Sequence, residues 1–200
     1  MKLHSASDII QAIEADPWMM KILEAVRDLY LPDGWICAGF VRSKIWDTLH
    51  DFRKRTPLPD VDVIYFDEVN VDENEEKKRE EQLRSMLPLV PCSVKNQARM
   101  HVANGVPPYA SSVDAISKFP ETATALGVKL GADGRVILAA PCGLDDVLQG
   151  VVRPTPFFRE SEARLAVYKE RILKKDWATT WDKLDIWVDI EKDSTSFLTP

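Results

Sequence analysis

The sequence Asp60-Val61-Asp62-Val63-Ile64-Tyr65-Phe66-Asp67 indicates a β-strand with carboxylates at alternate positions near its start. Side chains of a strand alternate between its two faces, so Asp60 and Asp62 point to the same side. Two carboxylates that lie this close repel one another, and a cation between them relieves the repulsion. Because all of these ligand atoms are oxygens, the pattern predicts a site for Mg²⁺ or Mn²⁺.

A second stretch, Ala38-Gly39-Phe40-Val41-Arg42, lies upstream and follows a short apolar strand predicted over 35–38. The glycine predicts a turn from strand to helix, where free backbone N–H groups and the Arg42 side chain would meet a phosphate. The helix that follows extends to about residue 52 and carries Lys44 on its polar face, a second candidate phosphate contact. A phosphate-binding turn ahead of paired carboxylates indicates metal-dependent phosphoryl or nucleotidyl transfer.

Composition excludes several other classes of protein. The 200 residues are 45% hydrophobic, which is enough for the core of one domain with or without a small appendage. The net charge is −6 without a long basic block, which argues against broad, non-specific binding of duplex DNA. No apolar run is long enough to cross a membrane, and the N-terminus lacks the apolar core of a signal peptide. The three cysteines are odd in number and widely spaced, so we expect reduced thiols in a cytoplasmic protein.

The order of the expected elements defines the fold class. We expect two helices within 1–30, a charged helix over 72–86 and a longer helix from about 160 to 175, with strands near 92–98, 126–130 and 135–139. Strands and helices alternate first and an antiparallel pair follows, which predicts an α/β (α+β) fold with a small mixed β-sheet flanked by helices. The predicted domain covers 1–153. A helical C-terminal extension is expected over 154–200, with weak periodicity in its last fifteen residues.

Four short motifs occur in an order that resembles a known family. They are the glycine turn, the Asp-x-Asp strand, Lys95-Asn96-Gln97-Ala98-Arg99-Met100-His101 and Pro141-Cys142-Gly143-Leu144-Asp145-Asp146. Together they are similar to the nucleotidyltransferase-like family of small bacterial proteins, which is related to the head domain of CCA-adding enzymes. The resemblance spans about Trp35 to Arg153. It implies the polymerase-beta-like nucleotidyltransferase fold, a mixed sheet flanked by helices.

The resemblance implies roles for individual residues. Asp60 and Asp62 match the two metal-binding carboxylates of the family, and Gly39 matches the glycine of the turn that holds the nucleotide phosphates. Phe40 stands where the superfamily usually has Ser or Gly, so the chain departs from the pattern there. No Asp or Glu occurs in 92–97, where a third carboxylate is often found on a neighbouring strand.

Further nucleotide contacts are expected from the same comparison. Arg42 matches an arginine that follows the turn in the related head domains. Asn96, Arg99 and His101 are spaced so that some of them line one cleft, with Arg99 on a phosphate and His101 on the base or ribose. A purely structural role is the alternative for His101, because it has no partner at metal-ligand spacing. Glu121 fits either an acid at a helix N-terminus or a replacement for the third carboxylate.

These observations predict an enzyme that moves a nucleoside monophosphate from a nucleoside triphosphate to a hydroxyl of an acceptor, using Mg²⁺ or Mn²⁺. RNA, a small molecule and a protein all remain open as acceptors. The first alternative is a nucleotide-binding or regulatory module with the same fold and no turnover, which the missing third carboxylate would allow. The second alternative is an interaction protein whose acidic strand is an exposed sheet edge.

Overall fold

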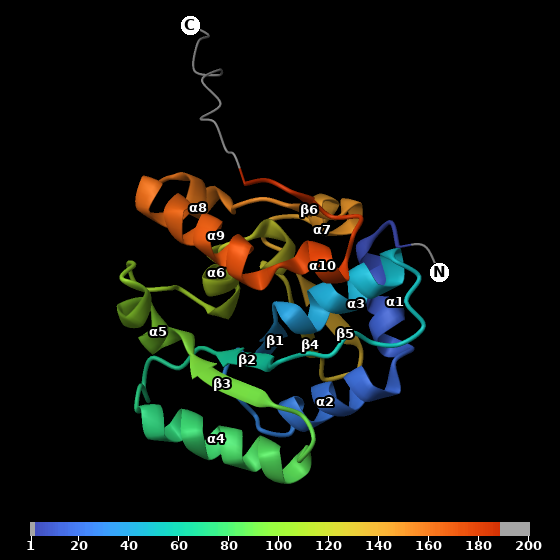
Figure 1. Cartoon of the computed structure of the whole chain (residues 1–200). Helices are drawn as coiled ribbons and strands as arrows, with labels where there is room; N and C mark the ends of the chain where they lie inside the picture. Colours follow the sequence, from blue (N-terminus) through green and yellow to red (C-terminus); the bar gives the residue numbers. More distant parts are fainter. Residues whose placement is uncertain (1–2, 189–200) are drawn as a thin grey trace, which may run out of the picture.

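The structure of the chain is a computed structural model that describes residues 3–188, and it confirms the predicted fold class. A five-stranded mixed sheet lies among helices (Figure 1). The helices are α1 (Ala6–Glu14), α2 (Pro17–Arg27), α3 (Gly39–Leu49), α4 (Glu73–Met86), α5 (Gln97–Asn104), α6 (Ser112–Ser117), η1 (Thr122–Thr124), α7 (Asp145–Gln149), α8 (Pro156–Arg159), α9 (Glu162–Lys175) and α10 (Trp177–Thr180). The strands are β1 (Trp35–Cys37), β2 (Val61–Tyr65), β3 (Cys92–Asn96), β4 (Gly127–Leu130), β5 (Val136–Ala139), β6 (Val151–Val152) and β7 (Asp185–Ile186).

The main sheet has the strand order β3-β2-β1-β4-β5. Only β2 and β3 run parallel, and the charged helix α4 connects them, as a parallel pair requires a crossover. In the sheet register Cys37 of β1 lies opposite Asp62 of β2, and Asp62 lies beside Ser93 of β3. The end of β1 and the starts of β2 and β3 therefore meet at one place.

The two faces of the sheet bury different clusters of side chains. Ile36, Val63 and Val128 belong to the main core with residues of α1, α2 and α3. The neighbouring residues on the same strands, Cys37 after Ile36 and Ile64 after Val63, point to the other face. They belong to a smaller cluster that includes residues of α6. Strand alternation assigns Asp62 to the second face, because it lies two residues before Ile64.

The chain after residue 153 packs on the same core. Tyr168, Ile172, Trp177 and Trp181 join the main cluster, and β6 pairs with β7 to form a two-stranded parallel sheet. The division into 1–153 and a C-terminal extension stays a prediction, although both parts share this core. Of the fifteen C-terminal residues, 189–200 lie outside the described residues.

Helix α5 was not expected from the sequence. The predicted strand over 92–98 ends at Asn96, whose side chain accepts a hydrogen bond from the Ala98 N–H and caps α5. Gly105 ends α5 in the left-handed conformation, with φ of 63°. The two capping residues, Asn96 and Gly105, were the signal for this helix.

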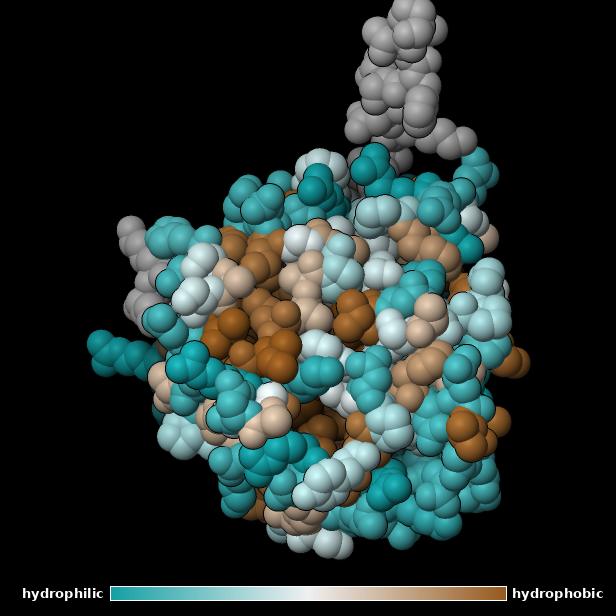
Figure 2. All heavy atoms as spheres, turned by 180° about the vertical axis from the view of Figure 1, so that it is seen from behind, coloured by the Kyte–Doolittle hydropathy of each residue, from teal (hydrophilic) through white to brown (hydrophobic). Residues whose placement is uncertain are grey.

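The surface is largely polar, in keeping with a chain in which 29% of residues are charged. On the face opposite to the view of Figure 1, hydrophobic side chains gather near the middle and hydrophilic side chains surround them (Figure 2). Within residues 3–188, every helix is too short or too polar to span a membrane.

Candidate functional site

The acidic pair lies where three strands meet. Asp60 is exposed just before β2, and Asp62 is half-buried within it. The Ser93 hydroxyl donates a hydrogen bond of 3.0 Å to Oδ1 of Asp62 from the neighbouring strand. Burial raises the pKa of Asp62 above its ordinary value, and the charge of Asp60 raises it further. The site therefore holds two carboxylates at an energetic cost that a bound cation would remove.

Two basic residues of α9 act on Asp62. The charges of Arg171 and Lys175 lower the pKa of Asp62 and so oppose the effects of burial and of Asp60. They lie four residues apart on one face of the helix. The sequence reasoning did not select them. The available signal was their i,i+4 spacing, but nothing in the sequence indicates that this helix face meets a strand more than a hundred residues upstream.

Glu121 directly precedes η1 and connects it to α9. Its carboxylate is fully buried, accepts a hydrogen bond of 2.6 Å from Nε of Arg171 and another of 2.6 Å from the Thr124 hydroxyl. Although Glu121 directly precedes η1, its side chain makes no capping hydrogen bond there. Residues 3–188 contain no group of three or more His, Cys, Asp or Glu side chains placed to hold a metal ion. Glu121 therefore binds Arg171 and does not join Asp60 and Asp62 as a third carboxylate.

Arg42 is buried against tryptophans. Its guanidinium carbon lies 4.9 Å from the ring centroid of Trp46, 4.5 Å from that of Trp177 and 5.7 Å from that of Trp181. Burial lowers the pKa of Arg42 to about 10, while the charges of Glu121, Asp60 and Asp62 act in the opposite direction. Nη2 donates a hydrogen bond of 3.2 Å to the Ser43 hydroxyl, and the buried Nε has no partner. Arg42 thus contributes positive potential near the acids and packing at the α3–α10 contact.

The predicted glycine turn starts α3 two residues after Cys37, the register partner of Asp62. Ala38 precedes the helix in a conformation with φ of 52° and provides no side-chain cap, so the first N–H groups of α3 are uncapped by its N-cap residue. The ring of Phe40 is buried and stacks on the exposed Trp18, with 5.9 Å between ring centroids. Only the backbone of Gly39 and Phe40 is available to a phosphate.

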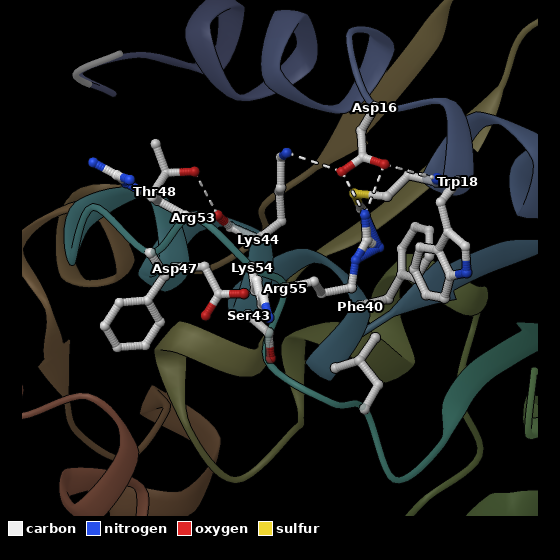
Figure 3. Close-up of a pocket in the computed structure, with 13 residues that line it drawn as sticks. Asp16, Trp18, Phe40, Ser43, Lys44, Asp47, Thr48, Arg53, Lys54 and Arg55 are labelled. Carbon is white, nitrogen blue, oxygen red and sulfur yellow. Dashed lines mark hydrogen bonds and ion pairs between the residues drawn. The ribbon is translucent and has the colours of Figure 1, made fainter.

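Lys44 belongs to a different pocket, of about 200 Å³, on another face of α3 (Figure 3). Residues two apart on a helix point about 200° apart, so Lys44 faces away from the direction of Arg42. Its Nζ donates a hydrogen bond of 2.9 Å to Asp16, and Arg55 donates two more to the same carboxylate, of 2.7 and 2.6 Å. Figure 3 shows Lys44 and Arg55 converging on Asp16.

The three candidates at the end of β3 and in α5 make contacts that hold the fold together. Asn96 is buried and binds the backbone carbonyls of the loop after β2 through its amide. Arg99 makes a bidentate ion pair with the buried Glu76 of α4, at 3.1 and 2.8 Å. His101 packs edge-on against Tyr109 and buries Nδ1 without a hydrogen-bond partner. Their roles as nucleotide contacts stay predictions.

The site combines features that suit a polyphosphate and a divalent cation. Two carboxylates lie at the start of β2, positive charges of α3 and α9 act at this place, and a helix start without a side-chain cap is adjacent. Negative phosphate oxygens would be attracted by the cations, and a metal ion would lie between them and the carboxylates. Such an arrangement can bind an activated phosphate ester for group transfer.

Comparisons with known proteins agree with this chemistry. A family model described as Nucleotidyltransferase matches residues 24–186. An NMR structure described as revealing a CCA-adding enzyme head domain is 39% identical, with a TM-score of 0.83 over 92% of this chain and 96% of that chain.

Larger enzymes share the fold alone. A CCA-adding enzyme in complex with ATP is 17% identical, with a TM-score of 0.52 over 88% of this chain and 43% of that one. The Thermotoga maritima CCA-adding enzyme complexed with tRNA_CCA is 15% identical, with a TM-score of 0.52 over 94% and 43%. The chain thus spans less than half the length of these enzymes. A search of curated proteins gave no match.

Proposed function

Because the chain belongs to the nucleotidyltransferase family, we propose that it transfers a nucleoside monophosphate from a nucleoside triphosphate to a hydroxyl of an acceptor. The bond between the acceptor oxygen and the α-phosphorus forms, the bond from the α-phosphorus to the bridging oxygen of the β-phosphate breaks, and pyrophosphate leaves. The hydroxyl proton passes to solvent. The observation that carries this proposal is that Asp62, two residues after Asp60, is subject to the positive charges of Arg171 and Lys175.

Asp60 and Asp62 would hold Mg²⁺ or Mn²⁺. Two observations support the fit: both donors are carboxylates, and burial together with the charge of Asp60 raises the pKa of Asp62. A set of only two carboxylates is compatible with magnesium, because this ion commonly binds one or two carboxylates together with substrate phosphates. When bound, the metal neutralises charge on the phosphates and activates the attacking hydroxyl.

The remaining roles belong to residues of three elements. The backbone N–H groups of Gly39 and Phe40 would bind phosphate oxygens at the start of α3, since Ala38 provides no side-chain cap. Arg171 and Lys175 would stabilise negative charge on the triphosphate from α9, and Glu121 orients Arg171 for this task. Arg42 adds positive potential near Asp60 and Asp62.

Label transfer tests the proposal. The protein would be incubated with each α-labelled nucleoside triphosphate and Mg²⁺ or Mn²⁺, with a cell extract as the source of RNA, small-molecule and protein acceptors. Wild type is expected to transfer label, and an Asp60→Asn/Asp62→Asn double variant is not. Glu68→Gln is the matched control, because it removes one exposed carboxylate just after the same strand. Equal transfer by the double variant would contradict the proposal.

A nucleotide-binding or regulatory module is the second candidate. The observation in its favour is that the nearby buried Glu121 is bound to Arg171 and Thr124, so it is engaged instead of completing a three-carboxylate site. This candidate predicts stabilisation of the wild type by nucleotide and Mg²⁺ without release of pyrophosphate. Thermal melting with nucleotide, run beside the label assay, separates the two functions.

A further inference from the structure

A cavity of about 570 Å³ lies between the end of α5, the end of α6 and the helices α8 and α9. Its size is within the range of ligand pockets, about 300–1,000 Å³. Four aromatic rings contribute to its wall, and they belong to Tyr109, Phe119, Phe157 and Phe158. None of the seven nucleotide-binding candidates selected from the sequence lines it.

Helix α9 links the cavity to the acidic site. Arg164 and Val167 line the cavity, and Arg171 and Lys175 act on Asp62. These four residues are spaced by three, four and four, so they lie on one face of the helix. At a rise of about 1.5 Å per residue, Val167 and Arg171 are about 6 Å apart along the axis. Pro120 also lines the cavity, and the next residue, Glu121, binds Arg171.

The charges in the cavity wall are already neutralised. Lys118 pairs with both carboxylate oxygens of Asp114 at 2.6 Å. Arg164 donates to Glu160 at 3.2 Å and lies over the Phe157 ring, with its guanidinium carbon 3.7 Å from the centroid. The cavity therefore suits an uncharged planar group more than a second phosphate. Asn104 and Ser161 add polar groups to the wall. The side chain of Ser161 makes no capping hydrogen bond to α9.

We propose that this cavity binds the base of the nucleoside triphosphate whose phosphates lie at Asp60, Asp62, Arg171 and Lys175. The inference rests on the proposed function and adds the place where the nucleoside is held. Aromatic side chains stack on any base, because every base has a π-face. A few polar groups in a mostly apolar wall then orient the bound base.

The test compares two alanines of α9. Ala163 lines the cavity, whereas Ala166 is exposed on the same helix and does not line it. Binding of a non-hydrolysable nucleoside triphosphate and of inorganic tripolyphosphate would be measured by calorimetry with Mg²⁺ present. Ala163→Trp fills the cavity and is expected to weaken nucleotide binding tenfold or more, with tripolyphosphate binding unchanged within twofold. Ala166→Trp is expected to leave both affinities unchanged within twofold.

The outcomes separate the inference from the function it rests on. If Ala163→Trp binds nucleotide as Ala166→Trp does, or loses tripolyphosphate binding equally, the base is not held in this cavity. If wild type binds tripolyphosphate and no nucleoside triphosphate, the proposed function is overturned and the base site with it. Melting curves check that the variants fold. Val167→Trp fills the same cavity from an exposed position, is expected to give the same result, and replaces Ala163→Trp if that variant unfolds.

Discussion

Nε of Arg171 donates a hydrogen bond of 2.6 Å to the fully buried carboxylate of Glu121, fifty residues earlier in the chain. The pair ties α9 to η1 and fixes the guanidinium where its charge acts on Asp62. The Arg171 side chain keeps about a third of its surface exposed, whereas that of Glu121 has none. Because only Glu121 is fully buried, removing Arg171 and removing Glu121 should change the free energy of unfolding by different amounts.

Arg171→Ala is expected to destabilise the fold by about 3 kcal/mol, because it leaves a buried carboxylate without its charged partner. Glu121→Gln should cost less, about 1 kcal/mol, since the remaining arginine reaches solvent and the amide still accepts a hydrogen bond. Urea unfolding followed by tryptophan fluorescence measures both values. Lys174→Ala removes an exposed cation of the same helix and is the control, with a change within about 0.5 kcal/mol. A larger loss for Glu121→Gln than for Arg171→Ala would refute this account.

Asp62→Asn should separate stability from function. Burial and Asp60 both disfavour the charged Asp62, so the neutral amide relieves this cost and still accepts the Ser93 hydrogen bond. Without metal, we expect the melting temperature to rise by about 2–4 °C, the shift that about 1 kcal/mol produces in a chain of this size. Label transfer should be lost. A variant that melts below wild type in the absence of metal would show that Asp62 is not electrostatically strained.

The raised pKa of Asp62 also predicts a pH dependence. The folded protein holds this proton to higher pH than the unfolded chain does, so stability falls as pH rises from the ordinary value of 3.8 through the folded pKa. Mg²⁺ competes with the proton and should abolish this fall. Melting temperatures of wild type minus those of Asp62→Asn, taken across this pH range with and without Mg²⁺, isolate the contribution. An identical difference with and without Mg²⁺ would mean that the metal does not bind there.

Arg42 contributes packing as well as charge, and two variants distinguish these roles. Arg42→Ala should cost about 2–4 kcal/mol, because it empties the space between Trp46, Trp177 and Trp181. Arg42→Met fills most of that space and removes an unpartnered Nε–H, so it should cost about 1 kcal/mol or less. If Arg42 also attracts the triphosphate, both variants should weaken nucleotide binding equally. If the loss of nucleotide affinity in the two variants follows their loss of unfolding free energy, the role of Arg42 is purely structural.

Gly39→Ala tests how closely a phosphate approaches the start of α3. An added Cβ would meet Nη2 of Arg42 at 3.6 Å and Cδ2 of Leu58 at 3.9 Å, which are ordinary contacts, so the fold should change by less than about 0.5 kcal/mol. Affinity for nucleoside triphosphate, measured by calorimetry, is expected to fall because the methyl group lies beside the helix N–H groups. Unchanged affinity would place the phosphates away from this turn.

Local patterns were sufficient for most of the fold. Ser5 and Asp8 cap the first helix reciprocally, and Asp16 followed by Pro17 starts the second, as their spacing predicts. The strands β1, β2, β4 and β5 and the helices α4 and α9 also lie where periodicity places them. The helix α5 was missed because the polar run after Val94 has no clear hydrophobic period, so its two capping residues were the only sequence signal for it.

For the candidate site, the sequence alone determined that Asp62 lies in a strand two residues after Asp60 and that a helix begins at Gly39, because both follow from the geometry of adjacent residues. Only the tertiary structure decided which charges meet: Arg171 and Lys175 act on Asp62, Glu121 binds Arg171, and Arg99 pairs with Glu76. Long-range pairs of this kind depend on how α9 and α4 dock on the sheet. Docking is set by the summed burial of many apolar side chains. The sequence around a charged residue therefore does not predict which partner this packing brings into contact with it.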